Sequence, residues 1–178
     1  NIRFTEMPDA PKYYPEVKVY DVTDAGTGEH IAVFMTDYFP RASKRQGAWM
    51  SEFKGSWIND DGTADRPIIF NVGNFSKPTA DAPSLLTLDE VETMFHEFGH
   101  GLHGMLSRAR YKCQSGTNVD RDFVELPSQI HEHWAMDPEL LRIYAHDYQT
   151  GEVIPDALIE KLEKASTHNQ GFATAELA

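Results

Sequence analysis

Cysteine is nearly absent from this sequence of 178 residues, with Cys113 as the one example. A single cysteine excludes an intramolecular disulfide and a zinc cluster built from cysteine thiolates. Low cysteine use fits a reducing compartment, so we expect the cytoplasm, with the periplasm as the alternative. Cys113 has no convincing activating partner and the sequence contains no G-x-S-x-G motif, so nucleophilic catalysis is not indicated.

Long apolar runs and an excess of positive charge are missing as well. No run approaches the ~18 apolar residues that a membrane-spanning helix needs. The formal net charge is -12, from 16 lysines and arginines against 28 aspartates and glutamates. Nucleic-acid surfaces need a basic stripe and anionic membranes attract cations, so we expect neither as a partner. The 40% of hydrophobic residues is nevertheless enough for the packed core of one ordinary domain.

The first part of the chain, residues 1–80, has the pattern of β-strands. Alternating valines and aromatics in "EVKVYDVTDAGTGEHIAVFMTDYF" predict two strands joined by the glycine-containing turn "DAGTGEH". "PIIFNVGNF" predicts a third strand at Ile68–Phe75, whereas "WINDDGTADR" is typical of a loop and "ASKRQGAWMSEF" is ambiguous. These strands predict a small antiparallel sheet.

The second part, residues 87–178, has the pattern of helices. "TLDEVETMFHEFGHGLHGMLS" begins with a capping box, in which Thr87 is the N-cap and Glu90 lies three residues later. Apolar residues then recur at spacings of three and four, as an amphipathic helix requires. "RDFVELPSQIHEHWAM" predicts a second helix with Pro127 in its first turns. The expected fold class is therefore α+β, a small antiparallel sheet followed by helices.

Three further helices are predicted toward the end of the chain. In "DPELLRIYAHDYQTG", Asp137 is a predicted cap, Pro138 the first helical residue and Gly151 the residue past the end. "PDALIEKLEKAS" and "NQGFATAELA" predict the other two. The sequence starts at Asn1 rather than methionine, and its last predicted helix has no stop signal, so we expect both ends to be cut from a longer polypeptide.

His96, Glu97 and His100 form the motif H-E-x-x-H inside the first predicted helix. Residues four apart on a helix lie on one face, so His96 and His100 can present two imidazoles to one metal ion. Glu97 is turned away by about a third of a turn, which suits a proton acceptor beside the ion better than a ligand. Two nitrogens and one carboxylate would give a tetrahedral zinc site with one open position. The alternative is a metal-free helical domain in which the histidines are incidental.

Three glycines, Gly99, Gly101 and Gly104, interrupt this helix, and each should weaken it by roughly 0.5–1 kcal/mol relative to alanine. We expect zinc binding to offset the loss, and Gly99 and Gly104 to let another backbone approach closely. His103 lies about 10 Å along the helix axis from His96. It is too far to share one ion and is expected to orient a ligand or to pack behind the site.

A third ligand must come from outside this helix. The carboxylates of the next predicted helix and the segment before it are the candidates, and periodicity alone does not choose among Asp120, Asp122, Glu125 and Glu132. Glu132 lies seven residues beyond Glu125, so these two can share a helix face.

The motifs together carry a resemblance. "FHEFGHGLH" followed by "SGTNVDRDFVELPSQ" resembles the thimet-oligopeptidase-like family of zinc metallopeptidases, and so do "GAWM", "NFSKPTADAPSLLTLDEVETMFHEFGH" and "NQGFATAEL". The stretch "HWAMDPELLRIYAHDYQTGEVIPDALIEKL" is most similar to the dipeptidyl carboxypeptidase branch. The resemblance implies that His96, His100 and Glu125 bind zinc and that Glu97 is the catalytic base.

The family's members are large, mostly helical enzymes with a deep substrate channel. The resemblance therefore implies that residues 1–178 are a single catalytic segment, whose partners are a short peptide substrate and the remaining parts of the parent polypeptide. The expected function is zinc-dependent hydrolysis of peptide bonds in short peptides, with release of C-terminal dipeptides. An endo-acting oligopeptidase of the same family is the alternative.

Two further points stay open in the sequence. The family's segment rich in glycine, tyrosine and histidine, downstream of "NQGFATAEL", has no match here, so a zinc-bound but inactive fragment is another alternative. Peptides often bind as an added strand at a sheet edge. The strand Ile68–Phe75 is the candidate edge, and the alternative is that it is simply a core strand.

Overall fold

The computed structural model describes residues 1–166 together with Gln170 and Ala175. Contacts divide the chain into two compact units, Asn1–Trp134 and Ala135–Ala178, and each is considered separately. The fold class is α+β, as predicted. The elements in chain order are β1 Ile2–Glu6, β2 Lys18–Asp24, β3 His30–Asp37, β4 Trp49–Lys54, β5 Trp57–Ile58, β6 Ala64–Asp65, β7 Ile68–Val72, α1 Leu88–Met105, a 3-10 turn Lys112–Gln114, α2 Leu126–Ala135, α3 Pro138–Tyr144 and α4 Asp156–Ser166.

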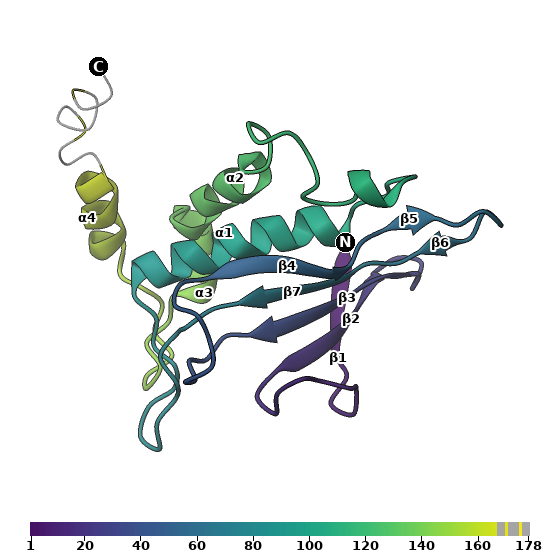
Figure 1. Cartoon of the computed structure of the whole chain (residues 1–178). Coiled ribbons are helices and arrows are strands. Elements are labelled where there is room, and N and C mark those ends of the chain that lie inside the picture. Colours follow the sequence, from purple (N-terminus) through teal and green to yellow (C-terminus); the bar gives the residue numbers. More distant parts are fainter. Residues whose placement is uncertain (167–169, 171–174, 176–178) are drawn as a thin grey trace. The chain divides into compact units, whose positions relative to one another are not determined.

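The main sheet is mixed, with the strand order β1-β2-β3-β7-β4 (Figure 1). β2 and β3 form the predicted antiparallel hairpin. β7, however, runs parallel to β3 and antiparallel to β4. The prediction of an antiparallel sheet was therefore wrong in part, because β7 inserts between β3 and β4 instead of pairing with its neighbour in sequence.

β7 is a central strand and ends at Val72, three residues before the predicted end. It is bonded to β3 on one side and to β4 on the other, and Ile69 and Val72 are buried. Both of its edges are therefore used, so the hypothesis that it binds an added peptide strand was wrong and the core-strand alternative holds. Among the strands of the described residues, β4 and β1 form the two edges of the sheet.

Several short strands were missed in the sequence. β1 pairs with β2, and β4 lies in the segment that was ambiguous. β5 and β6 form a small separate hairpin inside the predicted loop, with Gly62 at its turn in the left-handed region (φ 84°).

α1 lies along one face of the sheet and packs against β3, β4 and β7 (Figure 1). Its start is the predicted capping box, since the Thr87 hydroxyl accepts from the Glu90 N–H at 3.2 Å and the Glu90 carboxylate accepts from the Thr87 N–H at 2.8 Å. The core beneath it is formed by Val22, Ala32, Phe34, Ile69 and Met105. No helix in the described part of the chain is both long and apolar enough to cross a lipid bilayer.

The second unit contains α3 and α4. Asp137 caps α3 as predicted, and Pro138 is its first residue. The helix nevertheless ends at Tyr144, well before the predicted end. Gly151 instead closes a turn, in which its own N–H donates to the Asp147 carbonyl at 2.8 Å. α4 matches its prediction. The last predicted helix, 169–178, lies outside the described residues except for Gln170 and Ala175.

A buried ion cluster fastens the loop that leads into β4. The Asp37 carboxylate, 3% exposed, accepts from Tyr13, Arg41 and Lys44 at 2.8–2.9 Å. Lys44 Nζ also donates to the carbonyls of Asp37 at 2.9 Å and Gly73 at 3.0 Å. Burial by itself would raise the pKa of Asp37, but the hydrogen bonds from these three side chains outweigh it and hold the pKa below its usual range.

Replacing Lys44 with methionine is expected to lower the free energy of unfolding by about 3 kcal/mol, because the buried carboxylate loses a cation and the carbonyls lose a donor. The stability that Asp37 provides is present above its unfolded pKa of about 3.9 and is lost as the pH falls through its lower folded pKa. Since the variant loses part of this shift, its acid-unfolding midpoint is expected to move to higher pH. Urea denaturation at pH 7 and an acid titration followed by circular dichroism measure the two changes.

Lys18→Met is the matched control, since Lys18 forms an exposed ion pair with Glu6 at 3.3 Å. Exposed pairs contribute about 0–1 kcal/mol, so this variant is expected to unfold close to the unchanged protein. Equal losses in the two variants would contradict a stabilising role of the buried cluster.

Candidate metal centre

Two imidazoles and one carboxylate converge between α1 and α2. His96 and His100 lie one turn apart on α1, and the Nε2 atoms of their rings are 3.3 Å and 3.1 Å from the same oxygen, Oε2 of Glu125. One ligand atom from each of the three residues lies within 4.8 Å of the others. The structure therefore brings together the three side chains that the resemblance named, in a group that could hold a metal ion.

Glu125 directly precedes α2 and is fixed by that helix. Its carbonyl accepts from the Gln129 N–H at 2.9 Å, which closes the first helical turn. The fully buried Ser128 hydroxyl lies 2.8 Å from the Glu125 Oε2 and 2.9 Å from its carbonyl oxygen, as a donor to either. Pro127 is the second residue of α2, as predicted, where its missing N–H costs little.

Glu132 has a different place from Glu125. Its carboxylate oxygen accepts from Nδ1 of His96, the ring nitrogen on the side away from Glu125. This bond fixes the tautomer of His96 with a proton on Nδ1 and a lone pair on Nε2. The two glutamates thus share one face of α2, as predicted. The exposed residues Asp120 and Asp122 also lie outside the three-residue group, so Glu125 is the one of the four candidates that belongs to it.

The surroundings of His100 favour the neutral form of its imidazole. Only 9% of the residue is exposed, and burial lowers the pKa of its imidazole, although the nearby Glu125 carboxylate acts in the opposite direction. A neutral imidazole keeps the lone pair that a metal ion needs. Its Nδ1 is buried and has no hydrogen-bond partner among the residues that the structure describes.

Glu97 lies on the side of α1 that faces β4. The backbone N–H of Met50 lies close enough to its carboxylate to lower its pKa. Burial is the largest cause acting on its pKa and raises it, and the negative charge of Glu125 raises it further. His96 and the Met50 N–H act against these causes, but the net pKa stays above the usual range for glutamate. A carboxylate with a raised pKa is a stronger base near neutral pH than an ordinary glutamate.

His103 lies one turn beyond His100 but takes no part in the three-residue group. Its ring packs against Phe123, with centroids 6.2 Å apart, and its Nδ1 is buried without a partner among the described residues. No hydrogen bond from His103 to a ligand side chain is seen in the described part, so its position fits packing behind the site better than orienting a ligand.

Gly99 is the contact point between α1 and α2. A Cβ atom there would lie 2.7 Å from Cα of Ser128 and 2.9 Å from the carbonyl oxygen of Pro127, which is closer than real Cβ atoms come. The prediction of a close backbone approach at Gly99 is therefore confirmed. This approach brings Glu125 within reach of the two imidazoles.

Gly104 has a different neighbour. A Cβ atom at Gly104 would lie 2.7 Å from Cδ1 of Ile69 and 3.3 Å from Cε of Met50, both side-chain atoms of the sheet. The predicted close backbone approach is also found, because a Cβ atom on Gly116 would lie 3.2 Å from Cα of Gly104. Gly104 in addition lets α1 settle closely on the side chains of β7 and β4.

Sequence reasoning missed the roles of two residues on α2. Ser128 was not singled out, although a hydroxyl three residues after Glu125 lies on the same helix face. Glu132 was considered only as a candidate ligand, whereas the structure shows it hydrogen-bonded to Nδ1 of His96. Spacing along α2 could have suggested both contacts, but only the approach of α1 determines which atoms meet.

Two histidines one turn apart on a helix, joined by a carboxylate from the next helix, are typical of metal-dependent peptidases. The whole chain, residues 1–178, matches the sequence model of Peptidase family M3. The chain belongs to this family, and the predicted resemblance to thimet-oligopeptidase-like metallopeptidases is confirmed.

Three curated relatives show which proteins the chain is similar to and how much of each protein it covers. The chain is 48% identical to dipeptidyl carboxypeptidase of Escherichia coli (strain K12) over 177 residues, which cover 99% of this chain and 25% of that protein. It is 40% identical to oligopeptidase A of Salmonella typhimurium over 164 residues, 92% of this chain and 24% of that protein. It is 38% identical to a thimet-like oligopeptidase of Dictyostelium discoideum over 172 residues, 95% of this chain and 26% of that protein. The chain thus spans about a quarter of the length of these relatives.

Gly99→Ala is expected to lower the free energy of unfolding by about 1–2 kcal/mol. Alanine would gain up to about 1 kcal/mol in helix propensity. Overpacking costs about 1–3 kcal/mol, and it prevails here because the atoms in the way belong to the α2 backbone and cannot rotate aside. Urea denaturation measures the difference, with Glu92→Ala on the exposed side of α1 as the control. A more stable Gly99→Ala protein would show that α2 is free to move away.

Proposed function

We propose that this chain carries the catalytic zinc site of a peptidase, with His96, His100 and Glu125 as the ligands and Glu97 as the proton acceptor. The observation that carries the proposal is the meeting of two imidazole Nε2 atoms at one carboxylate oxygen, at 3.3 Å and 3.1 Å. Bare nitrogen lone pairs and a carboxylate repel one another at such distances unless a cation or protons lie between them.

The donor set fits zinc. Zinc bonds of about 2.0–2.1 Å at tetrahedral angles separate neighbouring ligand atoms by about 3.3 Å, close to both distances to Glu125 Oε2. The ligands are two neutral imidazole nitrogens and one carboxylate oxygen, a combination that leaves a fourth position for water or substrate. Glu132 on the other nitrogen of His96 is the kind of partner that increases a ligand's basicity.

When bound, zinc supplies a Lewis acid that polarises a peptide carbonyl and makes water more acidic. Glu97, with its raised pKa, accepts a proton from the attacking water at a carboxylate oxygen. It later delivers that proton to the nitrogen of the leaving amine. The nearby Met50 N–H stabilises the charged form of the Glu97 carboxylate.

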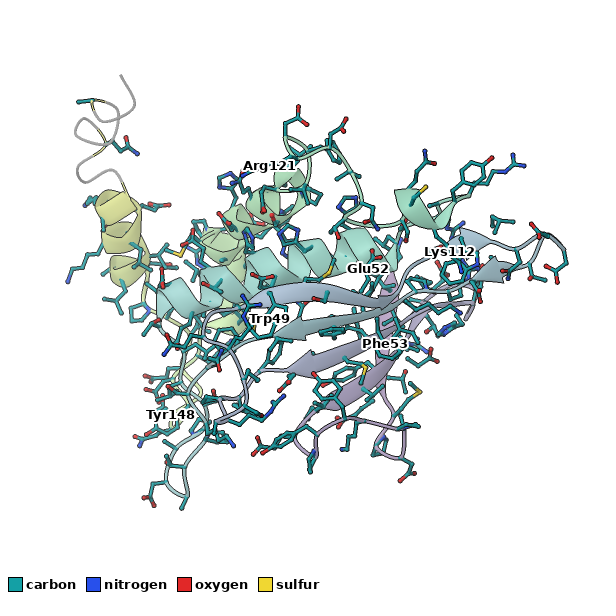
Figure 2. The ribbon with its side chains drawn as sticks, in the orientation of Figure 1. Trp49, Glu52, Phe53, Lys112, Arg121 and Tyr148 are labelled. Atoms are coloured by element: carbon teal, nitrogen blue, oxygen red, sulfur yellow. The ribbon has the colours of Figure 1, made fainter. Side chains whose placement is uncertain are left out.

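The outer edge of β4 is the surface that suits the peptide. β4 pairs with β7 on one side and with no other strand of the described residues on the other. Figure 2 shows Trp49 and Glu52 on this strand, which packs next to α1, and Met50 between them contacts Glu97. An extended peptide added to this edge would run past the ligand group.

For the whole protein we propose release of C-terminal dipeptides from short peptides, with internal cleavage by an endo-acting oligopeptidase as the alternative. The names of the relatives support both, since dipeptidyl carboxypeptidase and oligopeptidase A each match most of this chain. Residues 1–178 would then be the catalytic segment, and the other parts of the polypeptide would complete the substrate channel. A zinc-bound but inactive module is the third candidate, and the intact Glu97 argues against it.

Glu97→Gln is expected to keep zinc but to lower the rate of peptide hydrolysis by about 10²–10⁴-fold, since glutamine cannot accept the proton. Zinc content by atomic absorption and hydrolysis of a fluorogenic peptide measure the two effects. His96→Ala is the companion variant and is expected to lose both zinc and activity. Full activity in Glu97→Gln, or loss of its zinc, would contradict the assigned role.

The cleavage position is tested with a tripeptide that is blocked at its N-terminus. A dipeptidyl carboxypeptidase is expected to release the C-terminal dipeptide from this substrate, and mass spectrometry identifies the product. The same tripeptide with an amidated C-terminus is the control, and its cleavage is expected to be much slower. Cleavage of only longer, amidated peptides at internal bonds would favour the endo-acting alternative.

A further inference from the structure

His131 forms a hydrogen bond between α2 and α1 outside the ligand group. Its Nδ1 lies 2.8 Å from the carbonyl oxygen of Phe95. A carbonyl oxygen can only accept, so Nδ1 carries the proton and donates it. The ring also packs beside Phe95 and Phe98, with centroid distances of 5.4 Å and 5.6 Å.

This bond is attached to the turn of α1 that carries the two histidine ligands. Phe95 directly precedes His96, and in an α-helix its carbonyl faces the N–H of residue 99. Cβ of His131 is also one of the three atoms nearest to the open side of Gly99, at 3.0 Å from the place of a Cβ atom there. The hydrogen bond from His131 and the close backbone approach at Gly99 therefore hold α2 against the same turn of α1.

On α2, His131 lies between the two carboxylates that act at the site. Glu132 is the next residue and bonds to Nδ1 of His96, whereas Glu125 lies at the start of the helix and faces both Nε2 atoms. A helix is stiff over this length, so a shift of α2 at His131 would move both carboxylates relative to the imidazoles.

The space around His131 increases the importance of its hydrogen bond to Phe95 for the position of α2. His131 lines two cavities, of about 520 Å³ and 400 Å³. The described side chains therefore leave part of the space around the ring unfilled. The outward residues of α2, Leu126, Ile130 and Trp134, are about half exposed and do not hold the helix against α1.

We propose that His131 is a positioning residue: by donating Nδ1–H to the Phe95 carbonyl, it sets the register of α2 on α1 and so places Glu125 and Glu132 at the metal ligands. The inference rests on the proposed function, because the placement of the two glutamates by His131 matters only if His96, His100 and Glu125 bind a metal ion. His131 does not touch substrate or metal in this account and acts through the two glutamates.

Three substitutions separate the donor from the bulk of the ring. Asparagine places its amide nitrogen at the same distance from the backbone as Nδ1 of histidine, so His131→Asn keeps the donor. Glutamine places its amide about one bond farther out, near the position of Nε2, so His131→Gln keeps polarity but misplaces the donor. His131→Leu keeps apolar bulk beside Phe95 and Phe98 but has no donor.

Zinc affinity, measured by competition with a chromophoric chelator on the purified, metal-stripped protein, is the first readout. His131→Leu and His131→Gln are expected to weaken zinc binding by about tenfold, the lower end of the effect of partners around metal ligands. His131→Asn is expected to bind zinc nearly as well as the unchanged protein. The second readout is Tm with and without zinc, because weaker binding reduces the rise in Tm that zinc produces.

Each outcome decides between positioning and packing. Equal losses of Tm with and without zinc in the leucine and glutamine variants, at unchanged zinc affinity, would overturn the proposal and leave His131 as a packing residue. An asparagine variant that behaves like the leucine variant would also overturn it, because the donor would not be the cause. If the unchanged protein binds no zinc, the proposed function itself is contradicted, which is distinct from a failure of the positioning role alone.

Discussion

The convergence of His96, His100 and Glu125 is the constraint on which the rest of the site depends. One ligand atom from each residue lies within 4.8 Å of the others, and the Glu125 carboxylate attracts the imidazoles only when a proton or a cation lies between them. Packing helps to hold this arrangement in place. Gly99 lets the α2 backbone approach, Glu132 fixes one ring, and the Thr87 capping box and the sheet beneath fix α1. As a result, the imidazoles of α1 and the Glu125 carboxylate at the start of α2 face one another between the two helices.

The sequence predicted the structural features that depend on local signals. The capping box at Thr87, the helical spacing of His96 and His100, and the β2–β3 hairpin all depend on residues that are near one another in the chain, and all three were predicted. The place of Pro127 in α2 follows from the missing N–H alone. These features needed no knowledge of the rest of the fold.

Features that depend on distant residues could not be predicted in the same way. β7 was recognised as a strand, but its neighbours are set by long-range pairing, and strand propensity says little about which strands pair. Periodicity placed Glu125 and Glu132 on one helix face but could not say which would meet Nε2 and which Nδ1 of His96. That choice depends on how closely α1 and α2 approach at Gly99. The resemblance to a known family named Glu125, where spacing alone left four carboxylates open.

The position of Glu125 just before α2 has an electrostatic consequence. The first turn of a helix carries a partial positive charge from its aligned peptide dipoles, which favours a carboxylate there by about 0.3–1 kcal/mol. The charge of the Glu125 carboxylate is therefore partly balanced by the peptide groups of the helix that follows it. Its place in the fold does not depend on a cation alone for electrical balance, so folding of this region is expected to be separable from the binding of any ion.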